Sequence, residues 1–365
     1  MYGGTNTIAD LTGSRLAGPQ NVSVVEAGER ALAEQFADAT RIHNGWLRQI
    51  ISRICVWTTE KTLLYGGNDY TEMVEVDELG TARPSKVTGG YMLGFPLRPY
   101  EAAWQGSFKW FKKISAIGLR AQTQAMYDAD YRNVIREILR ALFRPTAYQW
   151  TDVLTDGGVM GAYKANVRPL LNADSQDIPR GPNGELFDAS THTHYVATTT
   201  FTDAGMIAFI NNVAEHYSDS VIEVWAAGNM ETGIRALTGF VPLDYPVIVQ
   251  SDNRDRIAER LDVGNLGDRL IGYYAGRRVY IRPYVPAGYL IAINVNSPTK
   301  TIVMRYDPLY ESGNLALEAE DEDYPLRAAT YSRTFGPGVW DRASAAIWKP
   351  SNTDNVYVAP TTYIY

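Results

Sequence analysis

The chain has 365 residues, of which 45% are hydrophobic and 21% are charged, and its formal net charge is −7 at pH 7. This composition is that of an ordinary globular protein, and the length predicts two or three domains. The negative charge argues against a protein that binds nucleic acid as a free chain, and the single cysteine, Cys55, excludes a disulfide within the chain. Neither an N-terminal apolar segment nor a run of about 18 apolar residues is present. We therefore expect a soluble intracellular protein with no membrane partner.

Residues 1–24 are rich in Gly, Asn, Thr and Ser without periodicity, which predicts an extended arm. From about Val25 to Cys55, apolar residues recur at helical spacing. We predict a helix here that contains Cys55 as a small buried hydrophobe. The apolar stripe of this helix consists of Leu32, Phe36, Ala39, Ile42, Trp46, Ile50 and Ile54.

Residues 56–106 differ from the helical patterns on both sides. Tyr70–Val76 alternates in part, Val87–Leu97 is a second extended run, and the residues near 77–86 are polar. This pattern predicts a long two-stranded excursion with a polar tip. An isolated hairpin is marginally stable in water, and the sequence offers no neighbouring strand. We therefore expect the excursion to lie on another subunit.

The longest periodic segment runs from about Ser107 to Phe143 and predicts one long helix. At 1.5 Å per residue it would measure roughly 55 Å. Pro145 ends it, because a proline forces the preceding residue out of the α region. We expect the other elements to lie across this rod. Its apolar stripe consists of Trp110, Ile114, Ile117, Ala121, Tyr131, Val134, Ile135, Ile138, Leu142 and Phe143.

Three lysines, Lys109, Lys112 and Lys113, occupy the start of this helix. The helix dipole disfavours positive charge there, at roughly a few tenths of a kcal/mol for each lysine. Two interpretations stay open. The lysines form a solvated face, or they meet an anionic neighbour, which is either a partner subunit or nucleic acid.

Residues 150–282 alternate between strand and helix patterns, which predicts an α/β region. Leu170–Ser190 is a polar loop, and a hairpin with its turn at Gly276-Arg277 is expected at Leu270–Tyr284. Thr202 or Asp203 caps a helix. The stripe of that helix is Met206, Ile210, Val213 and Tyr217. The other predicted elements are strands at Tyr195–Phe201, Val221–Trp225 and Tyr245–Gln250, and a helix near Asn229–Leu237.

Residues 285–365 are rich in strand patterns. An acidic insert, Glu318–Asp323, is expected to be a solvated loop, with a cation site or a docking patch for basic partners as alternatives. A hairpin turn is predicted at Gly336-Pro337-Gly338. The predicted strands are the consecutive pair Tyr289–Val295 and Thr301–Tyr306, and the pair Arg327–Phe335 and Val339–Trp348 on either side of that turn.

Motifs for catalysis and cofactor binding are missing. The sequence has no Walker phosphate loop, no dinucleotide fingerprint, no G-x-S-x-G elbow and no H-E-x-x-H pair. His192 and His194 would lie on one face of a strand, as metal ligands can, but no third ligand is placed, so we expect packing or surface roles for them. We assign no catalytic, cofactor-binding or metal-binding residue. Carboxylates are plentiful, so the paired acids of a glycosidase stay open.

One segment resembles a known family. Asp268–Ile281 contains the pattern G-x-Y-x-G-x-x-V-Y, and V-P-A-G follows within Tyr284–Ile291. Together they resemble a hairpin and the following segment in the major capsid proteins of tailed bacteriophages, and Arg333–Arg342 resembles the closing strands of that family. The order of the predicted elements agrees with the family over nearly the whole chain.

The resemblance implies an α+β chain with the Hong Kong 97-type capsid fold. Its parts are assigned in chain order: an N-terminal arm and first helix (1–55), an extended two-stranded loop (56–106) and the long spine helix as part of a peripheral domain (107–149). An α/β axial domain (150–284) and the β-rich strands of the peripheral domain with the C-terminus (285–365) complete the chain.

The resemblance also implies a function in assembly and no enzymatic activity. A major capsid protein self-assembles into pentamers and hexamers of an icosahedral head, and the head encloses double-stranded DNA. The expected partners are further copies of the chain, the packaged DNA bound without sequence specificity on the inner face, and scaffolding, portal and decoration proteins. The expected location is the virion, after assembly in the host cytoplasm. The alternatives are an encapsulin-like nanocompartment shell with the same fold and, more distantly, a cytosolic carbohydrate-active enzyme.

Two family features are tested against this sequence. Some members carry a long cleaved scaffolding segment, but fewer than about 60 residues precede the extended loop here, so we expect scaffolding to be separate or absent. Some members cross-link a loop lysine to a neighbour's asparagine, for which Lys86 is the candidate donor and Asn294 or Asn296 the acceptor. We place no catalytic glutamate for that reaction, so a plain contact is expected instead. In this family the spine helix faces inward, which would bring Lys109, Lys112 and Lys113 near DNA.

Overall fold

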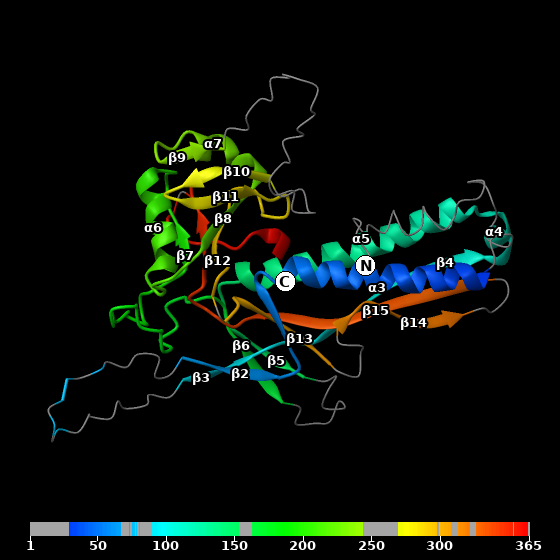
Figure 1. Cartoon of the computed structure of the whole chain (residues 1–365), viewed down its shortest axis with the longest axis horizontal. Coiled ribbons are helices and arrows are strands. Elements are labelled where there is room, and N and C mark those ends of the chain that lie inside the picture. Colours follow the sequence, from blue (N-terminus) through cyan, green and yellow to red (C-terminus); the bar gives the residue numbers. More distant parts are fainter. Residues whose placement is uncertain are drawn as a thin grey trace.

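The computed structural model describes residues 29–66, 73, 75, 76, 78, 80, 90–152, 163–243, 269–297, 299–307, 313–321, 326–352 and 354–363. The predicted arm at 1–24, most of the polar tip of the excursion and the predicted strand at 245–250 lie outside these residues. Within them the chain forms two main sheets with helices packed on and between them (Figure 1). Among the described helices, none combines the length and the hydrophobicity that a membrane-spanning segment needs.

Two long helices, α3 (Glu29–Ile51) and α5 (Ala116–Phe143), run side by side. The predicted single helix from 107 is interrupted, because Ser115 has extended backbone angles and its hydroxyl accepts a hydrogen bond from the Gly118 N–H. The residues before the break form the short helix α4 (Phe108–Lys113), which Ser107 caps in the same way. The prediction of one continuous rod was therefore wrong at Ser115, where an N-cap side chain starts a new helix. The 28-residue α5 measures about 42 Å.

A five-stranded sheet lies under the two helices. Its strands are β1 (Cys55–Thr58), β13 (Ile302–Tyr306), β15 (Leu326–Val339), β14 (Ala316–Asp321) and β4 (Arg98–Ser107). β1 is parallel to β13, and β4 runs antiparallel to β15 from Arg98↔Phe335 to Ser107↔Leu326. Cys55 is buried as expected, but it opens β1 and does not belong to the preceding helix, which ends at Ile51.

The predicted turn at Gly336-Pro337-Gly338 was wrong. β15 continues straight through it as a 14-residue strand, and Val339 pairs with Ile302 at its end. A Cβ on Gly336 would lie 1.9 Å from the Pro96 carbonyl oxygen, and one on Gly338 would lie 2.6 Å from the Phe95 ring. The two glycines therefore allow another backbone segment to pack closely against β15. Such close contact is a common reason for glycine inside a strand.

The acidic insert also differs from the prediction. Residues 316–321 form the strand β14, which pairs with β15 from Ala316↔Ser332 to Asp321↔Ala328. The side chain of Glu318 is exposed. A charged edge strand discourages uncontrolled pairing with other strands, so the acidic composition that suggested a loop fits an edge strand equally well.

The second large sheet has seven strands. Its strands, in spatial order, are β7 (Tyr195–Ala197), β16 (Ala345–Lys349), β12 (Leu290–Asn294), β8 (Ile222–Ala226), β11 (Arg277–Ile281), β10 (Arg269–Tyr274) and β9 (Phe240–Pro242). The helix α6 (Asp203–Ala214) covers one face of this sheet. A short 3₁₀ turn, η1 (Gly228–Met230), and the helix α7 (Glu231–Arg235) follow β8.

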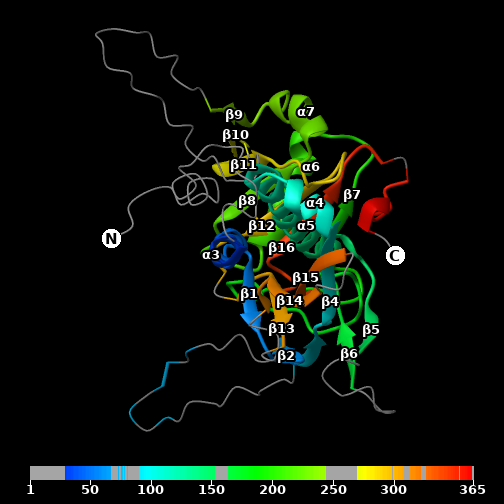
Figure 2. The ribbon, with the colours of Figure 1, turned by 90° about the vertical axis from the view of Figure 1, so that its right-hand side faces the viewer.

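The C-terminal half of α5 covers the other face, so α5 lies between the two sheets, as the turned view in Figure 2 shows. The central strands are buried on both faces, and their successive side chains point alternately to one face and to the other. On β8, Val224 and Ala226 pack with α6, whereas Trp225 packs with the cluster that contains Ile138 and Leu142 of α5.

The seven-stranded sheet crosses the predicted domain boundary at residue 284. β12 and β16 come from the predicted peripheral part, yet both pair within this sheet, β12 between β8 and β16. The reason is that β8 is central and buried, so it needs hydrogen-bonding partners on both edges. β11 supplies one edge and β12 the other. The consecutive strands β12 and β13 therefore belong to different sheets.

Several local predictions are confirmed. Thr202 caps α6 by accepting a hydrogen bond from the Gly205 N–H, and Met206, Ile210 and Val213 are buried. β10 and β11 form the expected hairpin, although its two-residue turn is Ala275-Gly276, both at positive φ, one position before the predicted Gly276-Arg277. The C-terminal segment adds a short 3₁₀ turn, η3 (Thr361–Tyr363), in which Tyr363 stacks on Phe143 at the end of α5.

Candidate assembly surfaces and polar clusters

The base of the two-stranded excursion rests on its own chain. β2 (Thr62–Tyr65) pairs with β3 (Tyr91–Gly94), and one face of the pair buries Tyr65 and Leu93 against Val303 of β13. β3 also lies on β6 (Lys164–Val167), where a Cβ on Gly94 would meet Ala165 at 2.5 Å. β6 itself pairs with β5 (Tyr148–Thr151). The expectation that no strand of this chain supports the excursion was therefore wrong at its base.

The opposite face of the same strand pair is apolar and uncovered. Leu64 and Met92 are directly opposite each other across the pair and are 60% and 49% exposed. Met73, further along the excursion, is fully exposed. Side chains of this type on neighbouring strands form a contiguous apolar surface, which is typical of a contact surface for another protein.

The lysines at the start of the spine region lie on α4. Lys109 and Lys113 are exposed, as is Trp110 between them, whereas the side chain of Lys112 lies outside the described part of the chain. No acidic residue occupies the first turn of α4. The surface at this end of the molecule therefore combines positive charge with an exposed aromatic ring.

A buried ion-pair network fastens the two long helices to the five-stranded sheet. Arg333 of β15 donates two hydrogen bonds to Asp130 of α5, and His43 of α3 lies 2.7 Å from the same carboxylate. Arg333 also donates to Asn44 of α3 and to the Gly313 carbonyl oxygen. Burial alone would raise the pKa of Asp130, but the hydrogen bond from His43 and the charge of Arg333 outweigh it and hold the pKa below its usual value.

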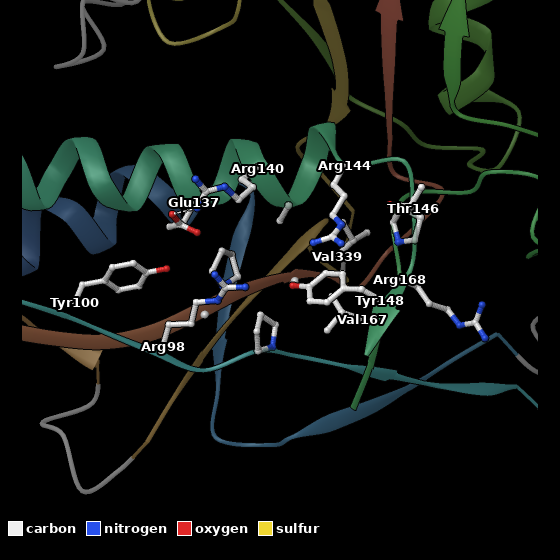
Figure 3. A pocket seen from close by; sticks show the side chains of 16 residues that line it. Arg98, Tyr100, Glu137, Arg140, Arg144, Thr146, Tyr148, Val167, Arg168 and Val339 are labelled. Atoms are coloured by element: carbon white, nitrogen blue, oxygen red, sulfur yellow. Dashed lines mark hydrogen bonds and ion pairs between the residues drawn. The ribbon is translucent and has the colours of Figure 1, made fainter. Parts of the chain in front are cut away.

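A hollow at the C-terminal end of α5 is lined by Arg98 and Tyr100 of β4, Glu137 and Arg140 of α5, and Arg144 just after it (Figure 3). Arg140 pairs with Glu137 along the helix. The guanidinium of Arg144 stacks 3.8 Å from the Tyr148 ring, and that of Arg98 lies 4.7 Å from the Trp150 ring. The remaining lining residues are Pro96, Ala141, Thr146, Tyr148, Val167, Arg168, Pro169, Gly336, Pro337, Gly338 and Val339.

The chemistry of this hollow is cationic. Glu137 is its one carboxylate among four arginines, although Arg168 extends away from the others and pairs with Asp174 (Figure 3). Burial, followed by the charge of Glu137, raises the pKa of the Tyr100 hydroxyl, so it stays protonated. Glycoside hydrolysis needs two carboxylates on opposite sides of a bond, and this lining supplies one that is already ion-paired. The hollow fits a negatively charged group better than a sugar.

The two histidines singled out in the sequence converge with two residues that were not predicted. The Nε2 atoms of His192, His194 and His216 lie 3.1, 3.1 and 3.2 Å from one another. Glu215 joins them, with its Oε1 atom 3.7 Å from Nε2 of His192 and 3.9 Å from Nε2 of His216. One ligand atom from each of the four residues lies within 4.8 Å of the others.

The surroundings of this cluster keep the histidines neutral. Burial lowers the pKa of His192, His194 and His216, for His216 to about 3. Burial raises the pKa of Glu215. His192 and His194 could be paired from the sequence by their spacing of two on an extended segment. His216 could not, because it follows α6 and is brought back to them only by the packing of that helix on the sheet.

The structure describes the two candidate asparagines of the cross-link but not the candidate lysine. Asn294 is buried, and its amide oxygen accepts hydrogen bonds from the backbone N–H groups of Val221 and Asn296. Asn296 is exposed. Lys86 lies outside the described residues. Of the two predicted acceptors, only Asn296 is therefore accessible to another chain.

Comparisons with known proteins identify similar structures but no similar sequence. No protein-family profile matches this chain, and neither does the sequence of any curated protein. Among solved structures, one described as "Mycobacterium phage Patience" is similar with a TM-score of 0.63 and 24% identity, covering 94% of each chain.

Two further similar structures are more distant. The bacteriophage PhiM1 mature capsid has a TM-score of 0.47 and 10% identity, covering 82% of this chain and 85% of the other. The capsid of a native GTA particle has a TM-score of 0.46 and 15% identity, covering 96% and 100%. Over nearly its whole length the chain has the mixed α+β fold of the Mycobacterium phage Patience structure, which agrees with the resemblance noted in the hairpin at 268–291.

Proposed function

We propose that this chain is the major capsid protein of a tailed phage and assembles into the pentamers and hexamers of an icosahedral head around double-stranded DNA. The observation that carries the proposal is the agreement in fold with the Mycobacterium phage Patience structure over 94% of both chains. In this proposal the protein is a structural component of the virion without enzymatic activity, and assembly takes place in the host cytoplasm.

The surfaces of the chain support a role in assembly. Exposed apolar side chains occur at separate places on the molecule, among them Leu64 and Met92 on the excursion, Leu186 on the polar loop and Val241 on β9. Many moderate contacts of this kind, repeated by closed symmetry, hold a shell together without one strong interface. We infer that the Leu64–Met92 face lies on a neighbouring subunit.

Each of the two sheets forms the centre of one proposed domain. The seven-stranded sheet with α6 and α7 is the proposed axial domain, and it includes β12 and β16 from beyond residue 284. The five-stranded sheet with α3 and α5 is the proposed peripheral domain. Lys109, Lys112 and Lys113 are proposed to face the packaged DNA, which they would contact through its phosphates without reading its sequence. Scaffolding, portal and decoration proteins are the further proposed partners.

The test is assembly of the full chain expressed alone. The protein is passed over a sizing column and viewed by negative-stain microscopy, and closed shells or rings of five and six subunits are expected. A chain that stays monomeric at high concentration, and also in the presence of its scaffolding protein, contradicts the proposal. Particles from the native source that hold protein cargo and lack nucleic acid would instead identify an encapsulin-like shell.

A further inference from the structure

We propose that His192, His194, His216 and Glu215 bind one zinc ion, which fastens the polar loop before β7 to the C-terminal end of α6. Zinc in proteins is usually held by four ligands in a tetrahedron, with Zn–N distances of about 2.0–2.1 Å. Two nitrogen ligands of such a tetrahedron lie about 3.3–3.4 Å apart. The three Nε2 atoms here are separated by 3.1–3.2 Å, so all three can reach one ion with little movement.

The hydrogen bonds of the outer ring nitrogens direct lone pairs toward the centre. Nδ1 of His194 lies 2.7 Å from the Ala345 carbonyl oxygen, and Nδ1 of His216 lies 3.3 Å from that of Pro179. A carbonyl oxygen only accepts, so each Nδ1 carries the hydrogen and each Nε2 carries a lone pair. These two lone pairs face each other at 3.2 Å and cannot form a hydrogen bond between neutral rings.

A cation at the centre resolves this conflict. His192 can contribute at most one proton to the cluster, and that proton can serve only one of the two facing lone pairs. The fourth group, Glu215, has a buried Oε1 atom without a hydrogen-bond partner beside the three rings. A divalent ion would accept all three lone pairs and compensate the charge of this half-buried carboxylate.

The shell around the cluster is typical of a metal site. Zinc-binding histidines commonly donate their second ring N–H to a backbone carbonyl, which fixes the tautomer and the ring orientation, as Ala345 and Pro179 do here. The Phe187 ring covers the cluster, with its centre 4.3 Å from that of His216 and 4.9 Å from that of His192. Imidazole ligands select zinc over the oxygen-seeking calcium and magnesium ions.

Four protein ligands indicate a structural site, because catalytic zinc keeps one position for water or substrate. The segment 172–194 contains no helix and no strand beyond an isolated bridge between Asn172 and Thr193. Side chains from α6 and the residues after it reach this segment, since Asn212 donates a hydrogen bond to the Thr193 carbonyl oxygen and His216 donates one to that of Pro179. A zinc ion would join this loop to α6 directly and, through the Ala345 hydrogen bond of His194, to β16. This inference stands on the side-chain geometry alone and does not depend on the proposed function.

The first test measures the metal bound by the full chain. The protein is freed of metal with a chelator, supplied with excess zinc sulfate, desalted and measured by mass spectrometry of its metal content. About one zinc ion per chain is expected. Replacement by Co²⁺ should give the intense visible absorption of a four-coordinate site with nitrogen and oxygen ligands. A zinc content near zero, or the weak spectrum of six-coordinate cobalt, overturns the proposal.

The second test uses variants at the two ligands that are partly exposed. His192→Gln and Glu215→Gln should each lose most of the bound zinc, whereas Glu185→Gln, an exposed carboxylate on the same loop, should keep it. Chelation should lower the melting temperature of the wild type and of Glu185→Gln and should leave the His192→Gln variant unchanged. Equal zinc content in all four proteins, or a wild-type melting temperature that chelation does not change, contradicts the assignment. The zinc content of the wild type decides the question even if a ligand variant does not fold.

Discussion

Arg333 and Asp130 face each other in a bidentate ion pair inside the protein, with Nε to Oδ1 at 2.7 Å and Nη2 to Oδ2 at 2.8 Å. Their side chains are 2% and 5% exposed. The pair joins β15 to α5, and its further bonds to His43 and Asn44 extend the connection to α3. Four charged or polar groups from three elements thus share one buried site, so the loss of one partner leaves the others without compensation.

Replacing Arg333 with methionine should lower the free energy of unfolding by about 3–5 kcal/mol, because it leaves the Asp130 carboxylate buried and without its cation. Urea unfolding of the unassembled chain measures the change. Arg132→Met, at an exposed position on α5, is the matched control and should stay within about 0.5 kcal/mol of the wild type. Equal losses in both variants would show that the ion pair adds no stability.

The same network predicts a dependence on acid. The pKa of Asp130 is lower in the folded chain than the unfolded value of about 3.9, so its ionised form stabilises the fold above that value. The contribution should be lost as the pH falls from about 5 through the folded pKa. Asp130→Asn keeps an acceptor for Arg333 but does not titrate, so its stability should decline less over this range. Parallel curves of urea midpoint against pH for the two proteins would contradict the assignment.

Gly336→Ala should destabilise the chain by about 3 kcal/mol or more, because the new Cβ would overlap the Pro96 carbonyl oxygen at 1.9 Å and neither backbone can withdraw. The control is Gly45→Ala on α3, where a Cβ meets nothing within 4 Å. Alanine there should raise stability by about 0.5–1 kcal/mol through its better helix propensity. Thermal unfolding of both variants measures the contrast, and a neutral Gly336→Ala would show that β15 and the segment at 94–96 can separate.

The exposed face of the excursion should be needed for assembly. The double variant Leu64→Lys and Met92→Lys should fold with near-native stability, since both side chains are largely exposed, but should yield subunits in place of shells on a sizing column. The exchange Leu64→Met with Met92→Leu keeps the apolar character and is the control that should still assemble. Normal shells from the lysine variant would remove this face from the proposed contacts.

The lysines of α4 should affect the packaged genome. Changing Lys109, Lys112 and Lys113 to Glu lowers the net charge of each subunit by six units, so heads should release DNA at a lower temperature, with the largest difference at low salt. Release is followed with a DNA-binding dye during heating. The corresponding change of all three to Arg keeps the charge and should behave as the wild type. If the Glu variant retains DNA as the wild type does, the lysines do not face the genome.

Local signals in the sequence were enough to predict some helices and turns. The cap at Thr202 and the stripe at Met206, Ile210 and Val213 define α6, because a helix start depends on residues within one turn. The β10–β11 hairpin followed from its turn, where Gly276 takes a positive φ. The G-x-Y-x-G-x-x-V-Y pattern in this hairpin also carried the resemblance that the fold comparison confirmed.

Which strands share a sheet depends on the packing of the whole chain. Gly336-Pro337-Gly338 has the composition of a turn, yet β15 continues through it. Phe95 and Pro96 pack against the two glycines, in the space that larger residues at these positions would fill with their side chains. β12 and β13 are neighbours in sequence but pair in different sheets, because each completes the hydrogen bonding of a distant strand. These outcomes depend on partners at least 29 positions away along the chain, which local composition does not identify.

The polar clusters likewise depend partly on local spacing and partly on long-range packing. The spacing of His192 and His194 indicated a shared face, but the approach of His216 and Glu215 required α6 to pack on the sheet. The ion pair of Asp130 with Arg333 likewise joins residues about two hundred positions apart. Local periodicity determines helices and turns because their hydrogen bonds close within a few residues, whereas buried polar groups are matched only when the packed chain brings their partners together.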